Sequence, residues 1–201
     1  MARVRGELRI VGGRYRGRRL PIPNETGLRP TSDRVRETLF NWLAPVIPGA
    51  RCLDAFAGSG ALGFEAVSRG AGEVVLIEKS GAVARQLDAN ARRLGAEQMR
   101  ILHADTLRWL EGPGRPFDIV FLDPPFAEAL WAPAIALLGL RGWVKPGSRV
   151  YLETPVRIGF PDLPRGWELV RDKCAGQVRY GLAIVGACDD AAAEDLASDP
   201  A

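Results

Sequence analysis

The chain contains 201 residues, of which 47% are hydrophobic and 25% charged, a composition typical of a folded domain that buries a substantial core. No apolar run approaches the roughly 20 residues that span a bilayer, and the N-terminus lacks the apolar centre of a secretion signal. We therefore expect a cytoplasmic protein with no membrane partner. Three scattered cysteines and one histidine predict neither a disulfide framework nor a metal site.

Charge is distributed unevenly along the chain. The formal net charge is +3, yet residues 1–42 contain ten arginines and only four acids, whereas residues 187–201 contain five acids and no base. A basic segment on a nearly neutral body is typical of proteins that bind a polyanion, although a solvated arginine-rich face would have the same composition. The acidic C-terminal segment is predicted to be a disordered tail.

The N-terminal segment predicts a small basic β-hairpin. Residues 8–11 and 14–20 have the pattern of two short strands around the turn Gly12-Gly13. Because most of its side chains are basic, this hairpin cannot build a core of its own. The chain is accordingly divided into an N-terminal extension, a main domain and an acidic tail, which are residues 1–30, 31–186 and 187–201.

A helix is predicted to follow the hairpin, from Ser32 to Leu43. Its apolar residues recur at helical spacing and define one buried face. The charged side chains of Arg34, Arg36 and Glu37 are expected to lie largely off this face. Residue 31, 32 or 33 can cap the start of the helix. The apolar face consists of Val35, Leu39, Trp42 and Leu43.

From residue 51 to residue 185, short apolar runs alternate with helical patterns, which predicts right-handed βαβ units. The expected fold is α/β, with a mostly parallel sheet and helices on both faces. The last two runs, 167–173 and 178–185, predict an antiparallel hairpin. The other strand candidates are 52–55, 74–77, 100–102, 119–122 and 149–152. The helix candidates are 61–69, 81–94, 106–110 and 128–138.

A glycine-rich segment follows the first predicted strand of this region and leads into a predicted helix. Its sequence is Asp54-Ala-Phe-Ala-Gly-Ser-Gly-Ala-Leu-Gly63. Glycines permit a tight turn and a close approach of ligand to the helix N-terminus. Glu78, at the end of the next strand, can accept hydrogen bonds from a ribose. The pattern fits both a dinucleotide and S-adenosylmethionine. Asp54 favours the methyl donor, because a carboxylate there would face a pyrophosphate unfavourably.

A third acidic residue, Asp105, follows the run at 100–102. It would lie at the edge of the sheet where open α/β folds bind ligands, and it could accept a hydrogen bond from an adenine amino group. Asp105 can equally cap the helix that begins at Thr106. Both roles can coexist.

The most informative stretch is Asp123-Pro-Pro-Phe126, directly after the hydrophobic run at 119–122. Two prolines end the strand and make the turn rigid. The exocyclic amine of a base is a poor nucleophile because its lone pair is delocalised into the ring. Asp123 and the Pro124 carbonyl can each accept one N–H of such an amine and direct its lone pair at a methyl group, while Phe126 stacks on the base.

Taken together, these motifs resemble those of class I amino-methyltransferases, whose fold is Rossmann-like. The N-terminal stretch Gly12-Gly-Arg-Tyr-Arg-Gly-Arg-Arg-Leu-Pro is more specific, and with Arg29-Pro-Thr-Ser-Asp-Arg-Val-Arg-Glu-Thr-Leu-Phe-Asn-Trp-Leu43 it resembles the RsmD family. That family methylates the N2 amine of a guanine in 16S ribosomal RNA of the small subunit. The resemblance covers about residues 8–185.

The resemblance implies a seven-stranded, mostly parallel sheet that ends in the antiparallel hairpin, with the N-terminal hairpin and helix added to it. It implies an enzyme that acts on 16S RNA within the assembled 30S subunit or a late precursor of it, and we expect this enzyme to be a monomer. The implied catalytic residues are Asp123, Pro124 and Phe126. The implied S-adenosylmethionine-binding residues are Asp54, Phe56, Ala57, Gly58, Gly60, Glu78, Asp105 and Thr106. The implied RNA-binding residues are Arg14, Arg16, Arg18, Arg19, Arg29 and Arg34.

Other functions share some of these features. A DNA or RNA adenine-N6 methyltransferase uses the same turn chemistry, but a DNA enzyme usually has a separate target-recognition segment. A methyltransferase of glutamine amides usually has Asn in place of Asp123. An oxidoreductase would leave the Asp-Pro-Pro-Phe turn without a role, and a non-catalytic RNA-binding protein would leave the cofactor residues without one.

Overall fold

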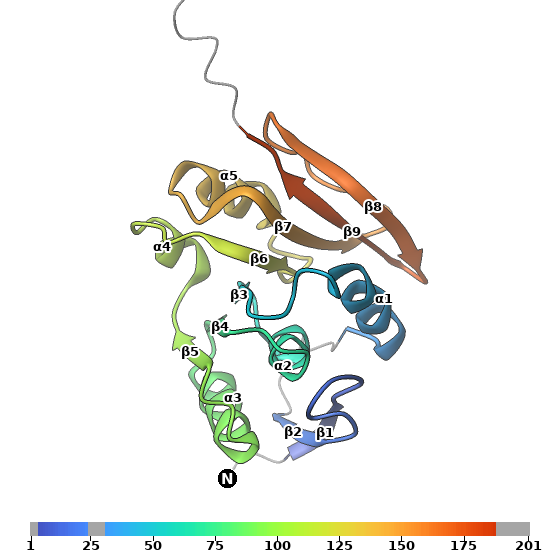
Figure 1. Ribbon diagram of the computed structural model, residues 1–201, viewed down its shortest axis with the longest axis vertical. Coiled ribbons are helices and arrows are strands. Elements are labelled where there is room, and N and C mark those ends of the chain that lie inside the picture. Colours follow the sequence, from blue (N-terminus) through green and yellow to red (C-terminus); the bar gives the residue numbers. More distant parts are fainter. Residues whose placement is uncertain (1–3, 24–30, 188–201) are drawn as a thin grey trace, which may run out of the picture.

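The computed structural model describes residues 4–23 and 31–187. Within these two ranges, nine strands and five helices form a three-layer α/β domain with a two-stranded hairpin at its side (Figure 1). The main sheet has the order β5-β4-β3-β6-β7-β9-β8, in which the last two neighbouring pairs are antiparallel. The seven-stranded sheet and its terminal hairpin are therefore as predicted. Its strands are β3 (Arg51–Asp54), β4 (Glu73–Glu78), β5 (Met99–His103), β6 (Phe117–Leu122), β7 (Val144–Pro155), β8 (Trp167–Ala175) and β9 (Val178–Val185).

Helices cover both faces of this sheet. One buried cluster joins α1, α2 and α3 to one face, and a second joins α4 and α5 to the other. None of the helices in the described ranges is long and apolar enough to cross a membrane. The helices are α1 (Asp33–Leu43), α2 (Ala61–Ser68), α3 (Gly81–Leu94), α4 (Thr106–Leu110) and α5 (Trp131–Leu140).

The order of the strands sets the position of the ligand site. From β3 the chain winds outward through β4 to β5, and then returns to place β6 on the other side of β3. The connections therefore diverge between β3 and β6, and such a switch point opens a crevice at the carboxyl ends of the strands. Asp54 ends β3 and Asp123 directly follows β6, so both acids lie at this crevice.

The N-terminal hairpin differs from its prediction in register. Its strands are β1 (Val4–Arg9) and β2 (Arg19–Pro23), and residues 10–18 form a longer connection than the predicted Gly-Gly turn. The reason is that this connection packs against α2. The N–H of Arg14 donates to the Ser68 carbonyl at 2.6 Å, and a Cβ on Gly13 would lie 1.9 Å from the same oxygen.

The apolar side chains of the hairpin belong to the core of the main domain. Leu8, Ile10 and Leu20 are each at most 2% exposed and join the cluster formed with α1 and α2. The hairpin thus has no separate core, in keeping with its basic composition. Residues 24–30, which link it to α1, and the acidic tail from residue 188 lie outside the described residues.

Arg36 on α1 corrects one prediction. It was expected off the buried face of its helix, but it is 1% exposed. Its guanidinium lies 3.4 Å from the fully buried Glu65 of α2, and it donates to the Arg9 carbonyl at 2.9 Å and to Asp33 at 2.5 Å. The helical pattern could not reveal this, because the ion pair joins the hairpin, α1 and α2, which are distant in sequence. Buried charges of this kind persist only when paired and hydrogen-bonded.

In the main domain, two elements also differ from their predicted bounds by three residues or more. Helix α5 begins at Trp131, three residues later than predicted, because Ala129 has a φ of 48°, which an α-helix cannot accommodate. Strand β7 runs from Val144 to Pro155 rather than from 149 to 152, since it pairs with β6 on one side and β9 on the other. Of the three candidate caps at residues 31–33, Ser32 is the N-cap of α1, and its hydroxyl accepts from the Val35 N–H.

Candidate active site

A cavity of about 760 Å³ opens at the carboxyl ends of β3, β4, β6 and β7. This size lies within the range of pockets that hold small molecules. Ten of the eleven residues expected to bind cofactor or to act in catalysis line it, and Gly60 does not. The ten are Asp54, Phe56, Ala57, Gly58, Glu78, Asp105, Thr106, Asp123, Pro124 and Phe126.

Gly60 shapes the glycine loop by its conformation. It has a φ of 76° and precedes α2, so a side chain would be strained there. A Cβ would also lie 2.6 Å from Leu87 of α3 and 2.7 Å from Phe64. Glycine at this position therefore lets α2 and α3 pack closely while the preceding loop faces the cavity. Gly58, which does line the cavity, has a φ of 50°.

Asp54 and Glu78 hold this loop from two sides. The Asp54 carboxylate accepts the N–H of Gly63 at 3.0 Å, in the first turn of α2. Burial raises the pKa of Asp54 to about 7, although the Gly63 N–H opposes the shift. Glu78 accepts the Gly58 N–H at 2.9 Å and the Ser80 N–H at 2.7 Å, one with each carboxylate oxygen. Each oxygen retains a second acceptor position for a ligand.

Asp105 and Thr106 anchor the start of α4. Asp105 caps this helix by accepting the N–H of Arg108 at 3.0 Å, as the sequence allowed. The Thr106 hydroxyl donates to the carbonyl of Ala55, which joins α4 to the end of β3. Asp105 uses one carboxylate oxygen in the cap, and both residues still line the cavity. A contact of Asp105 with an adenine amino group stays a prediction.

The Asp123-Pro-Pro-Phe turn forms the wall at the end of β6. Pro124 is buried, whereas Asp123 and Phe126 are partly exposed to the cavity. The ring of Phe126 lies 6.0 Å from that of Trp131, at the start of α5. The pKa of Asp123 is raised well above its usual range by burial, then by the negative charges of Glu153 and Asp54. A carboxylate here has little solvation, so it gains from any ligand that donates hydrogen bonds.

Glu153 is a site residue that the sequence-based prediction missed. It lies near the carboxyl end of β7, lines the cavity and is 6% exposed. The Tyr151 hydroxyl donates to its carboxylate at 2.7 Å. A signal was present in the sequence, because Glu153 follows the run at 149–152 just as Asp123 follows the run at 119–122.

Two further segments that line the cavity were also missed. Thr31 and Ser32, before α1, form one side, and the turn from Ala175 to Val178 between β8 and β9 forms another. No local signal marks these residues. They reach the cavity because the N-terminal helix and the C-terminal hairpin fold over the same sheet edge.

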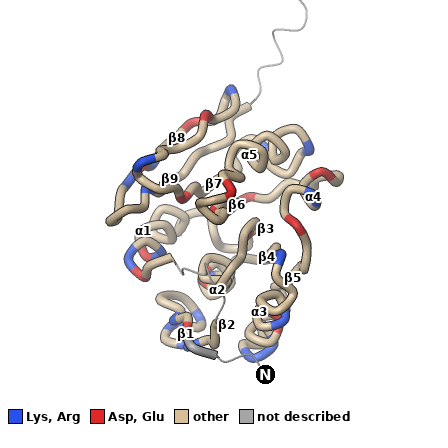
Figure 2. The backbone as a smooth tube through the Cα atoms, turned by 180° about the vertical axis from the view of Figure 1, so that it is seen from behind, with Lys and Arg blue, Asp and Glu red and all other residues tan. Residues whose placement is uncertain are grey.

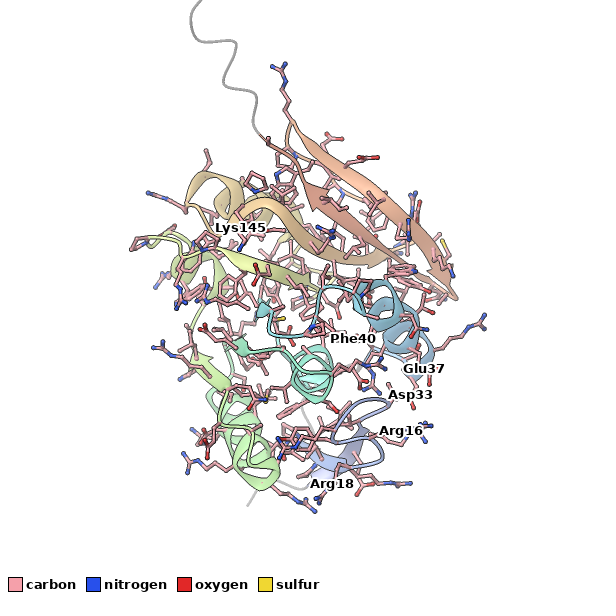
Figure 3. All side chains as sticks on the ribbon, in the orientation of Figure 1. Arg16, Arg18, Asp33, Glu37, Phe40 and Lys145 are labelled. Carbon is pink, nitrogen blue, oxygen red and sulfur yellow. The ribbon has the colours of Figure 1, made fainter. Side chains whose placement is uncertain are left out.

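Three of the arginines expected to bind RNA, Arg14, Arg16 and Arg18, lie apart from the cavity. They are in the loop that contacts Ser68, at the C-terminal end of α2, while the cavity lies at the other end of that helix. An eight-residue helix is roughly 12 Å long. Figure 3 shows Arg16 and Arg18 at the periphery of the molecule, on the hairpin. Arg29 lies outside the described residues.

A second cavity of about 330 Å³ adjoins the main one on the side of the hairpin. It lies between the strand ends of the hairpin and the first turn of α1, and it is lined by Arg9, Arg19 and Arg36 among others. Thr31 and Ser32 line both cavities. Figure 2 shows further basic residues on α3 and near β8, so positive charge is not confined to the hairpin.

Comparisons with known sequences identify close relatives. A protein family described as "Conserved hypothetical protein 95" matches residues 8–184. Ribosomal RNA small subunit methyltransferase D of Escherichia coli strain K12 is 51% identical over 177 residues, which cover 88% of this chain and 89% of that protein. The protein of the same name in Haemophilus influenzae is 47% identical over 183 residues, covering 89% and 94%.

Solved structures agree with these relatives. A putative methyltransferase from Escherichia coli has a TM-score of 0.86 and 48% identity, covering 91% of this chain and 100% of that one. The magnesium protoporphyrin IX methyltransferase of Synechocystis, whose structure contains bound SAM, has a TM-score of 0.57 at 20% identity and covers 75% and 78%. At that identity the second likeness concerns the fold alone.

Proposed function

The chain belongs to the RsmD family and is a ribosomal RNA methyltransferase of the Rossmann-like class I fold, and we propose that it methylates the exocyclic N2 amine of a guanine in 16S rRNA, with S-adenosylmethionine as the methyl donor. The observation that carries this proposal is the position of the Asp123-Pro-Pro-Phe turn. It shares one cavity with the glycine loop, Glu78 and Asp105. A methyl donor and an acceptor amine can therefore meet inside it.

The residues present fit S-adenosylmethionine. The loop at Gly58 has a backbone that admits a ligand closely, and Glu78 has free acceptor positions for ribose hydroxyls. Asp105 lies farther along the same sheet edge, where it can accept from an adenine amino group. A distant structural neighbour with this fold contains bound SAM. When bound, the cofactor supplies a methyl group on an electrophilic sulfonium.

The protein's own part in the reaction is to position the amine and to exclude water. Asp123 accepts one N–H of the amine and the Pro124 carbonyl accepts the other, which directs the nitrogen lone pair away from both acceptors. Phe126 stacks on the base and fixes its plane. After transfer the nitrogen carries one proton in excess, and the Asp123 carboxylate is the adjacent group that can take it.

RNA binding is assigned to the arginines of the hairpin and of α1. Arg14, Arg16, Arg18, Arg19 and Arg34 are exposed. The second cavity lies between the hairpin and α1 and shares Thr31 and Ser32 with the catalytic cavity. Because the loop arginines lie roughly one helix length away, they would contact phosphates that neighbour the target nucleotide. The target base must leave its stack to reach Asp123, which favours a loop or single-stranded site.

The proposed substrate is the 16S RNA of the assembled 30S subunit, and the proposed enzyme is a cytoplasmic monomer. The relatives that carry the name "Ribosomal RNA small subunit methyltransferase D" support the choice of RNA. In an assembled subunit, ribosomal proteins would form part of the substrate surface.

The test is to incubate the protein with labelled S-adenosylmethionine and, separately, unmethylated 30S subunits, free 16S RNA and duplex DNA. Nucleoside digestion should recover the label as N2-methylguanosine from the subunits. Asp123→Ala should lose this label, while Asp162→Ala, an exposed acid on the loop before β8, should keep it. Label in N6-methyladenine, or in DNA alone, would refute the proposal in favour of an adenine-N6 methyltransferase.

A further inference from the structure

Asp123 and Glu153 form a pair of carboxylates in the wall of the catalytic cavity. Strands β6 and β7 are parallel neighbours with Leu122 opposite Leu152, so the next residue of each strand, Asp123 and Glu153, occupies the same level of the sheet. Both residues line the cavity. The negative charge of Glu153 contributes to the raised pKa of Asp123. Two adjacent, poorly solvated carboxylates repel each other, so the pair is stabilised by a ligand with two adjacent hydrogen-bond donors.

Glu153 is held firmly in this position. Its carboxylate accepts from the Tyr151 hydroxyl at 2.7 Å, and its backbone carbonyl accepts from the Trp131 indole N–H at 2.9 Å. Tyr151 is fully buried, so the donor that orients Glu153 has no freedom to leave. A carboxylate held by a buried donor, on a backbone that is itself anchored, can discriminate between ligands by its geometry rather than adapt to each.

The amines of the nucleobases differ in what lies beside them. Guanine has a ring N1–H donor next to its N2 amine. Adenine and cytosine have an unprotonated ring nitrogen, an acceptor, next to theirs. A carboxylate beside Asp123 can therefore accept the N1–H of guanine but would oppose the lone pair of adenine N1 or cytosine N3. Sites that match a polar group by hydrogen bonding reject analogues that lack it, because a buried group is left unpaired.

We infer that Glu153 selects guanine by accepting its ring N1–H, while Asp123 and the Pro124 carbonyl hold the adjacent N2 amine. This inference rests on the proposed function, because it assigns a base-reading residue to the same cavity. Glu153 is thus a specificity-determining residue, and Tyr151 positions it. Of the three bases that have an exocyclic amine, guanine is the one whose edge presents hydrogen-bond donors to both acids.

The experiment compares two nucleosides that share the N2 amine as a possible methyl acceptor. Small subunits are reconstituted with 16S RNA that carries either guanosine or 2,6-diaminopurine riboside at the position methylated by the wild-type enzyme. Diaminopurine keeps the N2 amine, but its ring N1 is unprotonated and is a hydrogen-bond acceptor. The wild type should strongly prefer guanosine. Glu153→Gln keeps the shape and can donate its amide to N1, so the ratio of kcat/KM values, guanosine to diaminopurine, should fall by roughly ten- to a hundredfold.

Controls separate this role from a structural one. Glu97→Gln, an exposed acid just before β5, should leave the ratio unchanged. S-adenosylmethionine binding by calorimetry should be the same in wild type and Glu153→Gln. Tyr151→Phe removes only the orienting hydroxyl and should lower the ratio in the same direction by a smaller factor, which keeps the inference testable if Glu153→Gln does not fold.

The outcomes are distinct. If Glu153→Gln lowers turnover of guanosine and of diaminopurine by the same factor, the inference is overturned and the proposed function stays intact. The same holds if the variant loses S-adenosylmethionine affinity to the same extent as turnover. A wild-type enzyme that methylates neither acceptor would refute the proposed function itself, and this inference with it. A lowered ratio with unchanged cofactor binding supports both.

Discussion

Replacing Asp54 by Asn should make the protein more stable while weakening its ligand site. Asp54 is 3% exposed, and burial raises its pKa from 3.8 to about 7. Because one pKa unit is worth about 1.4 kcal/mol, the ionised carboxylate costs the folded state up to about 4 kcal/mol. Asn has the same shape, and its carbonyl oxygen can still accept the Gly63 N–H that Asp54 accepts.

The sign of the effect follows from the raised pKa. The folded state holds the Asp54 proton more tightly than the unfolded chain, so the stability linked to this proton is complete below pH 3.8 and is lost as the pH rises to about 7. Relative to wild type, Asp54→Asn should gain roughly 1–2 kcal/mol at pH 5 and roughly 4 kcal/mol at pH 8. In a domain of this size the larger gain corresponds to a rise in Tm of about 10 °C.

The assay is urea unfolding of both proteins at pH 5 and pH 8, with calorimetric titration of S-adenosylmethionine at pH 8. Asp118→Asn serves as a matched control for which the change in stability has the opposite sign. Burial raises the pKa of Asp118, but the Lys145 ammonium and the Arg51 N–H outweigh burial and lower it. That variant should lose a little stability at pH 8. If Asp54→Asn gained the same stability at both pH values, or lost stability at pH 8, then Asp54 would not carry a buried charge and the reasoning would be refuted.

Four further predictions concern catalysis and RNA. Asp123→Ala should lower kcat by at least roughly a hundredfold without unfolding the protein, as circular dichroism would check, and near-normal turnover would contradict the mechanism. Because the pKa of Asp123 is raised, wild-type kcat should fall as the pH decreases through a value above the usual aspartate range; a flat pH–rate profile would argue against an ionised Asp123. Phe126→Ala should weaken substrate engagement by roughly 1–3 kcal/mol in kcat/KM, and no change would exclude stacking. Reversing the charges of Arg14, Arg16 and Arg18 should lower RNA affinity and flatten its dependence on salt while cofactor binding is unchanged; an equal loss of cofactor binding would show that the loop is structural.

The fold was largely predictable because its signals are local. Each parallel strand contains a short apolar run, and each of α1 to α4 has a periodic apolar pattern or a cap close by. The bounds of α3 and α4 match their predictions, and the pair β8 and β9 was expected as an antiparallel hairpin. Helix α5 was misplaced at its start because the backbone at Ala129 departs from helical geometry, which alanine itself does not signal.

The site was predicted where acids follow strands, with the exception of Glu153, and missed where contact comes from distant elements. Asp54, Glu78, Asp105 and Asp123 each stand at or just after the end of a strand, so the topology of a parallel sheet gathers them at one edge. The turn at 175–178 and the residues before α1 carry no such mark. They reach the cavity only through the packing of the two ends of the chain.

The amino-acid sequence by itself determined the order of strands and helices, the glycine loop and the rigid turn at Asp123, because these depend on residues adjacent in the chain. Tertiary structure alone decided that Arg36 is buried against Glu65, that the loop arginines lie away from the cavity, and that Glu153 stands beside Asp123. The physical reason is that burial and electrostatic coupling depend on distances through space. Those distances are set only when helices and strands pack together, and only then does a carboxylate lose its water and acquire a neighbour of like charge.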